Sequence, residues 1–193
     1  MAKPEEKISS ISLKKRYDRH AADVLQDFLI ELLREGKGPR WYKIKKALPS
    51  THDYDTLREA KYSKTITEAL DDANSEVDSL RDEMSEWRDN MEEKFSSTSK
   101  YEDVSSVADE LDNLNLPDTE GLPDIRVVLL PGEGNSRAHR ASDAAATYNL
   151  VAEKLDEFID KMTTEDKDSL EELVSTIQEA ASALENISFP GMF

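Results

Sequence analysis

The chain has 193 residues and a formal net charge of −17, with 42 acidic side chains, 25 basic side chains and no cysteine. A chain of this length forms one domain, or one domain with an appendage. The absence of cysteine excludes disulfides, thiolate metal sites and cysteine nucleophiles. No apolar run approaches the roughly 18 residues needed to cross a bilayer, so the sequence predicts an intracellular protein without a membrane role.

The charge is distributed unevenly along the chain. Residues 1–46 hold 12 basic and 7 acidic side chains, whereas the remaining residues hold 13 basic and 35 acidic ones. This segregation indicates two surfaces with different partners, or a basic arm beside an acidic body. The acidic body alone is expected to repel nucleic acid and anionic lipid.

The first predicted helix covers residues 13–35, where a wide apolar stripe ends just before Gly36. The connector after it mixes cations with aromatic rings, the groups that contact phosphates and stack on bases. The candidate nucleic-acid contacts are Arg40, Trp41, Tyr42, Lys43, Lys45 and Lys46. In the competing interpretation, Trp41 and Tyr42 pack under the helix and the lysines remain solvated.

A long second helix is predicted from near Asp53 to about Phe95, because this stretch contains neither glycine nor proline. Within it, apolar residues alternate at intervals of four and three. They are Ile66, Leu70, Ala73, Val77, Leu80, Met84, Trp87 and Met91. A mean spacing of 3.5 residues is typical of helices that wrap around each other.

The partner of this heptad seam is left open between a second copy of the chain and another helix of the same chain. In a parallel homodimer, Glu76 of one chain would face Arg81 of the other. Glu83 would face Arg88 in the same way, so the charges favour a parallel over an antiparallel homodimer. The bulky Trp87 and the alanine-rich helices later in the chain favour pairing within one chain instead, since exposed ion pairs contribute only ~0.2–0.5 kcal/mol each.

A shorter helix is predicted after a polar break, capped by Ser99 with Glu102 and ending near Leu114. Residues 115–135 then carry three prolines and three glycines. Within them, the apolar run IRVVLL suits either a short strand or a buried extended segment. Because no second strand candidate is present, we predict a buried linker.

Two further helices follow, with heptad spacing over residues 141–162 and 173–187 and a cap at Asn135 or Ser136 for the first. Their joint is so short that they must form an antiparallel hairpin. The apolar tail SFPGMF is expected to pack against the protein or bind a partner.

The predicted fold is therefore an all-α helical bundle with a long central heptad-patterned helix and a C-terminal αα-hairpin. Its segments are residues 1–50, 51–114, 115–135 and 136–193, integrated into one domain.

No catalytic or metal-binding pattern emerges from the sequence. The three histidines are scattered, and the acidic stretch DNLNLPDTEG lacks the ligand spacing of a calcium loop. PGEGNSR, near Arg137 and Arg140, has the character of an anion-binding turn but lacks the lysine and spacing of a P-loop, so a helix cap explains it better. We therefore predict no enzymatic activity, no cofactor and no metal.

The segments LRDEMSEWRDNMEE and SSTSKYEDVSSVADELDNL, within residues 80–114, resemble a stretch of uncharacterised acidic helical proteins of tailed bacteriophages. The resemblance covers under a fifth of the chain and transfers no functional residues. It implies a phage-encoded protein that acts in the cytoplasm of the bacterial host or in the virion.

The leading functional hypothesis is a non-enzymatic phage protein that acts through protein–protein contacts, in assembly or by binding a host factor. Its partner is a second copy, giving a homodimer, or another phage or host protein. One alternative is a nucleic-acid-associated protein that uses the basic residues 14–46. Another is an acidic DNA mimic that occupies the basic groove of a host protein.

Overall fold

The computed structural model describes residues 61–130, 132, 134–162 and 167–191. The chain divides into two compact units, residues 1–63 and 64–193, and nearly all described residues belong to the second. The predicted helix over residues 13–35 and the candidate nucleic-acid contacts at 40–46 lie outside the described residues.

The long helix α5 spans Ile66–Phe95. Lys61 and Tyr62 before it are also helical, so the helix predicted from near Asp53 is interrupted at Ser63–Thr65, and its start lies outside the described residues. Thr65 closes a capping box: the amide of Glu68 donates to the Thr65 hydroxyl at 3.1 Å, and the Glu68 carboxylate accepts from the amide of Thr65 at 2.9 Å. Because Thr65 is extended, residues Ser63–Thr65 form the short strand β1 instead of a turn of helix. Because this stretch contains neither glycine nor proline, no break in the helix was predicted at Ser63–Thr65.

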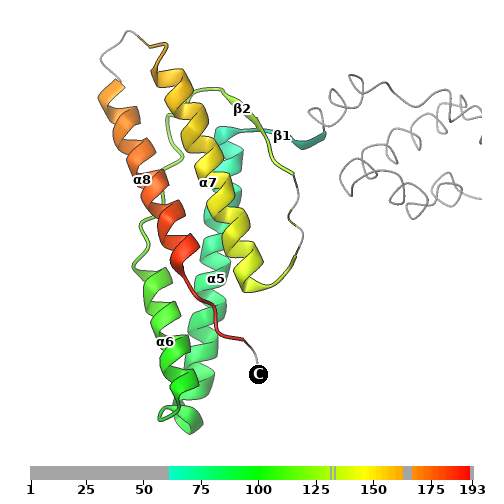
Figure 1. The fold of residues 1–193 in the computed structure, drawn as a ribbon, viewed down its shortest axis with the longest axis vertical. Helices are drawn as coiled ribbons and strands as arrows, with labels where there is room; N and C mark the ends of the chain where they lie inside the picture. Colours follow the sequence, from blue (N-terminus) through cyan, green and yellow to red (C-terminus); the bar gives the residue numbers. More distant parts are fainter. Residues whose placement is uncertain (1–60, 131, 133, 163–166, 192–193) are drawn as a thin grey trace, which may run out of the picture. The chain divides into compact units, whose positions relative to one another are not determined.

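Helix α6, Ser99–Asp112, returns antiparallel to α5 after a break at residues 96–98 (Figure 1). Its cap is Thr98, one residue before the predicted cap, with the amide of Tyr101 donating to the Thr98 hydroxyl at 3.2 Å. The last turn of α6 has no basic residue of its own. Instead, the Arg81 guanidinium of α5 donates to the carbonyl of Leu111 at 2.7 Å and to that of Leu114, which satisfies free acceptors at the helix end.

The linker after α6 contains a short strand, β2, at Arg126–Val128, which pairs with β1. The amide of Ile66 also donates to the carbonyl of Ile125 at 2.9 Å. The prediction of a linker without a strand partner was therefore wrong at this point, because the partner lay inside the segment that had been assigned to helix. Leu114 and Val127 are buried, so the linker also covers the core.

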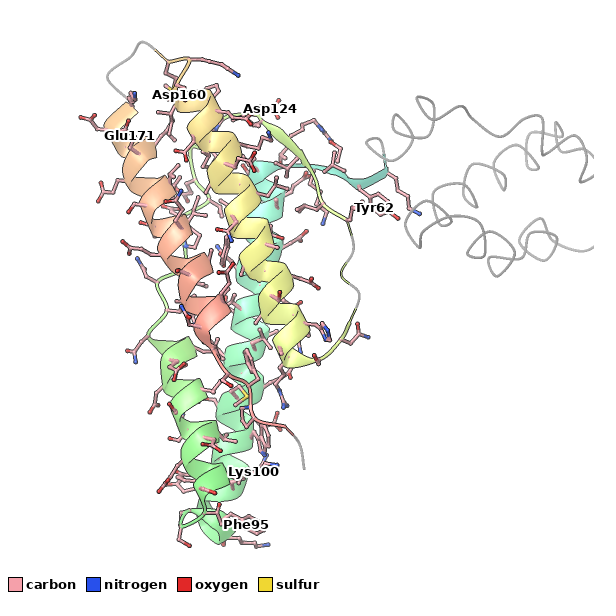
Figure 2. All side chains as sticks on the ribbon, in the orientation of Figure 1. Tyr62, Phe95, Lys100, Asp124, Asp160 and Glu171 are labelled. Atoms are coloured by element: carbon pink, nitrogen blue, oxygen red, sulfur yellow. The ribbon has the colours of Figure 1, made fainter. Side chains whose placement is uncertain are left out.

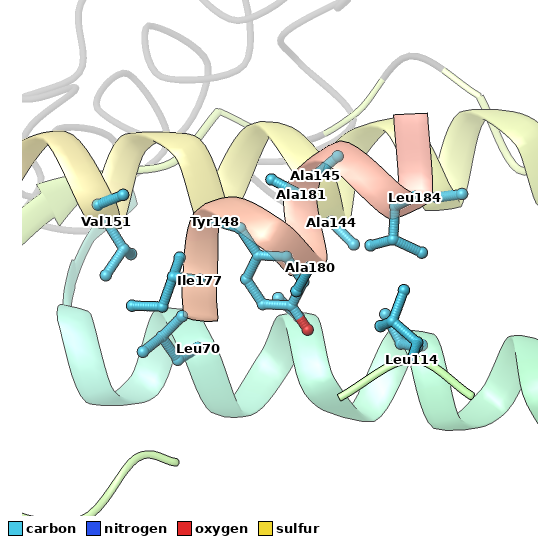
Figure 3. Packing of buried hydrophobic residues seen from close by; sticks show 14 of the residues in the cluster. Leu70, Leu114, Ala144, Ala145, Tyr148, Val151, Ile177, Ala180, Ala181 and Leu184 are labelled. Carbon is cyan, nitrogen blue, oxygen red and sulfur yellow. The ribbon is translucent and has the colours of Figure 1, made fainter. Parts of the chain in front are cut away.

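Helices α7, Arg137–Ile159, and α8, Lys167–Asn186, form the predicted antiparallel hairpin (Figure 1). Ser136 caps α7 by accepting from the amide of His139 at 3.2 Å. Small side chains allow the two helices to approach closely. Figure 3 shows Ala144 and Ala145 of α7 near Ala180 and Ala181 of α8, and Tyr148 projecting from α7 towards α5.

The core is one continuous apolar cluster, and within the described residues no polar or charged side chain is fully buried. Helix α5 is the shared element of the bundle, because α7 packs along it from its start to Trp87 and α6 packs along its second half. One internal polar pair links α7 to α5: the Tyr148 hydroxyl donates to Asn74 Oδ1 at 2.7 Å, and Asn74 Nδ2 donates to the carbonyl of Pro117 at 3.0 Å.

The fold is an all-α helical bundle, as predicted, with a two-stranded sheet at one end. Over the residues that the structure describes, no helix is both long enough and apolar enough to cross a membrane.

Candidate protein-interaction site

The heptad seam of α5 is buried over its first part and progressively exposed towards its end. Ile66, Leu70, Val77, Leu80 and Met84 have no exposed surface, and Ala73 is also buried. The structure therefore uses this part of the seam within the chain, as a core surface against α6 and α7. Trp87 and Met91 are only partly buried, and the next apolar residue along the helix, Phe95, is 50% exposed.

The exposed end of the seam results from where α7 begins. The first residue of α7, Arg137, lies over the ring of Trp87, with its guanidinium carbon 4.8 Å from the ring centroid. Beyond this point α5 continues for about two further turns, with α6 as its neighbouring helix among the described elements, and Figure 2 places Phe95 at the far end of the α5–α6 hairpin. We call Trp87, Met91 and Phe95 the tip seam.

The surroundings of Trp87 differ from those expected. The sequence suggested that small residues of the C-terminal helices would pack on this ring. The structure instead places two cations over it, Arg137 and Lys100, the latter with Nζ 5.5 Å from the centroid. Such contacts contribute ~0.5–1 kcal/mol each at exposed sites. The two cations cover the ring in part, and Trp87 stays partly exposed.

The glutamates that flank the seam find their partners in α7. Arg140 donates to both Glu76 and Glu83 and also to the Ser79 hydroxyl at 3.0 Å, while Arg137 Nε donates to Glu83 at 3.0 Å. The expected interchain pairs, in which Glu76 faces Arg81 and Glu83 faces Arg88, are thus replaced by ion pairs within the chain. Residues 76 and 83 lie two helical turns apart on one face of α5, so a single arginine reaches both.

Burial acts to raise the pKa of the Glu83 carboxyl, but hydrogen bonds and charge from Arg140 and Arg137 outweigh it and hold the pKa below its ordinary value. Burial acts to lower the pKa of Arg140, but the carboxylates of Glu83 and Glu76 outweigh it and raise that pKa above its ordinary value. Glu83 therefore accepts from Arg137 Nε and from Arg140 within the chain.

The remaining seam arginines bind α6. Arg81 also pairs with Asp78 at 2.8 Å, in addition to its contacts at the end of α6. Arg88 pairs with Asp109 at 3.0 Å and donates to the Ser85 hydroxyl at 3.0 Å. These two side chains therefore fix the α5–α6 hairpin and are already engaged within the chain.

The C-terminal tail crosses the bundle near the start of α7 (Figure 1). Ile187 and Phe189 pack against the core cluster while staying partly exposed. An open cleft of about 380 Å³ lies beside Phe189. Its walls are residues 189–191 of the tail, residues 135–138 with Arg140 at the start of α7, and Glu83 of α5. We call this hollow the Phe189 cleft.

No metal centre is seen among the described residues, where no three histidine or acidic side chains are placed to share an ion. His139 lies 2.6 Å from the Ser136 hydroxyl at the cap of α7, whereas His20 and His52 fall outside the described residues.

Sequence reasoning missed both the ion-pair cluster between α5 and α7 and the cleft beside the tail. Two features of the sequence could have indicated them. Arg137 and Arg140 lie close together on a helix otherwise rich in alanine, and apolar residues follow α8.

Neither a protein-family model, nor a curated protein, nor a solved structure matches the chain.

Proposed function

We propose that this chain is a non-enzymatic protein of a tailed bacteriophage that acts by packing its tip seam against a helix of another protein molecule. The observation that carries the proposal is the exposure of Phe95, four residues beyond Met91, on a helix whose seam is buried from Ile66 to Met84 but only partly buried at Trp87 and Met91. A large exposed apolar side chain beside partly buried apolar neighbours is typical of a surface that a partner covers.

A helical partner fits this surface best. Two antiparallel helices without a third enclose only a shallow core, and Trp87 and Met91 remain partly exposed for this reason. A helix packed against α5 beyond Trp87 would continue the packing that α7 provides along the earlier part of α5. It would bury the exposed faces of the tip seam, at ~25 cal/mol for each Å² removed from water.

The setting in a phage is supported by the resemblance of residues 80–114 to acidic helical phage proteins. That segment contains the second half of α5 and the whole of α6, and so includes the tip seam. The partner is then a second copy of the chain or another phage or host protein.

The test uses Phe95→Asp with Leu130→Asp as a matched control, because these two are the large apolar side chains most exposed among the described residues. Light scattering over a range of protein concentrations measures self-association. Capture from lysates of infected and uninfected bacteria, repeated with the purified captured protein, measures binding to a different partner. Circular dichroism verifies that both variants keep their helix content.

We expect Phe95→Asp to weaken the association at least tenfold, about 1.4 kcal/mol, and Leu130→Asp to leave it unchanged. The proposal fails if the chain stays monomeric and captures nothing, or if every association is indifferent to Phe95→Asp.

The charge segregation of the sequence favours a second candidate function, nucleic-acid binding through the connector at residues 40–46, which lies outside the described residues. This function predicts binding to DNA or RNA that weakens as salt rises and is lost when Lys43, Lys45 and Lys46 are replaced by alanine. Absence of binding at low salt would remove it.

A further inference from the structure

Residues 187–191 of the C-terminal tail are held by few interactions with the rest of the described chain. After α8 ends at Asn186, residues 187–191 adopt neither helix nor strand. Their one hydrogen bond to the described part of the chain joins the amide of Ile187 to the carbonyl of Leu184 at 3.3 Å. Ile187 and Phe189 supply the contacts with the core. A segment held by two apolar side chains and one hydrogen bond opens at low free-energy cost.

The tail also fills only part of the hollow in which it lies. The Phe189 cleft stays open beside it, and a volume of about 380 Å³ falls within the range of sites that hold small ligands or several side chains. A segment that occupied both the position of Phe189 and the open cleft would therefore make more contacts than the tail makes.

The open part of the cleft offers hydrogen-bond donors. Arg137 uses Nε to bind Glu83, and its two terminal nitrogens have no hydrogen-bond partner among the described residues. Arg140 differs, because all three of its nitrogens donate to Glu76, Glu83 and Ser79. An acceptor brought into the cleft would thus bind Arg137, which is also fixed by its position over Trp87.

We propose that this hollow is a binding groove for an extended segment of a partner protein, one that places an aromatic side chain in the position of Phe189 and a hydrogen-bond acceptor at Arg137. The tail is the resident competitor for the groove. The inference rests on the proposal that the chain acts through protein contacts and specifies the chemistry of one partner segment. A tethered tail has an effective concentration on the order of millimolar, so a partner must gain its advantage from the open cleft and Arg137.

The experiment uses the tail sequence itself as the probe, as the capped peptide NISFPG, residues 186–191. Trp87 is the reporter, in a Trp41→Phe background that removes the other of the two tryptophans, and the peptide contains none. Because Arg137 both lines the groove and lies over Trp87, filling the groove should change the emission of that ring.

We expect the peptide to bind the Phe189→Ala chain about tenfold more tightly than the chain with an intact tail, since a competitor lowers the fraction of open grooves. A control peptide with alanine in place of phenylalanine should not bind at the same concentrations. A peptide ending in aspartate, NISFPD, should bind several-fold more tightly still, and Arg137→Met should abolish that gain.

A second variant covers the case in which Phe189→Ala does not fold. Six Gly/Ser residues inserted after Asn186 keep every tail side chain but lower the effective concentration of the tail. They should raise the affinity for the peptide in the same direction. Equal affinities in all chains, or no binding to any, would overturn the inference. Association that depends on Phe95 is measured separately, so the proposed function can survive that result.

Discussion

Replacing Leu80 with aspartate tests whether the first part of the heptad seam is the core of one chain or a surface between chains. Leu80 has no exposed surface. Exposing a leucine side chain forfeits about 1.5–3 kcal/mol. The introduced carboxyl would have to stay protonated at pH 7, and a pKa raised by about 3 units corresponds to about 4 kcal/mol. The total, about 6 kcal/mol, is comparable with the 5–15 kcal/mol that stabilises a typical domain.

We therefore expect Leu80→Asp to abolish the cooperative thermal transition and most of the helical circular dichroism signal. Val77→Asp should behave in the same way, because Val77 is equally buried. Phe95→Asp is the control, and since that side chain is half exposed it should fold. If Leu80→Asp instead kept its helix content and melting transition and changed only its mass by light scattering, the seam would pair between chains.

Three smaller perturbations follow from individual contacts. Tyr148→Phe removes the hydrogen bond to Asn74 and should lower the free energy of unfolding, measured in urea, by about 1–2 kcal/mol. Asn74→Ala completes a double-mutant cycle, and a coupling energy of zero in that cycle would contradict the contact. Thr65→Ala removes the cap of α5 and should lower the free energy of unfolding by about 1 kcal/mol. An unchanged melting temperature would show that the capping box does not stabilise the fold. The pKa of Glu83 lies below its ordinary value of 4.5, so its carboxylate stabilises the fold above that pH and the stabilisation is lost as pH falls through the lowered pKa. Glu83→Gln should therefore reduce the loss of thermal stability between about pH 5 and pH 3, with Glu86→Gln, at an exposed position of the same helix, as the matched control.

The helices of the second unit were predictable because heptad spacing is a local property of the sequence. The buried residues of the seam and the antiparallel C-terminal hairpin follow from that spacing and from the short joint near residue 163. The interruption of the predicted helix at Ser63–Thr65 was not predicted, because the absence of glycine and proline does not require a helix to continue. Thr65 and Glu68 have the spacing of a capping box, and that signal was readable.

The candidate site was harder to predict, since it depends on residues far apart in the chain. Glu83 and Arg140 are separated by 57 positions, and no local pattern marks them as partners. Strand β2 needed a partner from before α5, and short strands leave little periodicity to detect. The tail was recognised as apolar, but its place beside the start of α7 depends on the lengths and packing of all four described helices.

The position of α5 between two sets of neighbours also has a consequence for the order of folding. Helices α5 and α6 are joined by three residues, whereas the contact of α5 with α7 closes a loop of about forty residues, at an extra entropic cost on the order of 2 kcal/mol. The α5–α6 hairpin is therefore expected to form first, and α7 to dock later. Until α7 arrives, the seam lacks the cover that α7 provides, so the surface proposed to bind a partner is available from the earliest stage. Once α7 has docked, the part of the seam that remains available to a partner begins at Trp87.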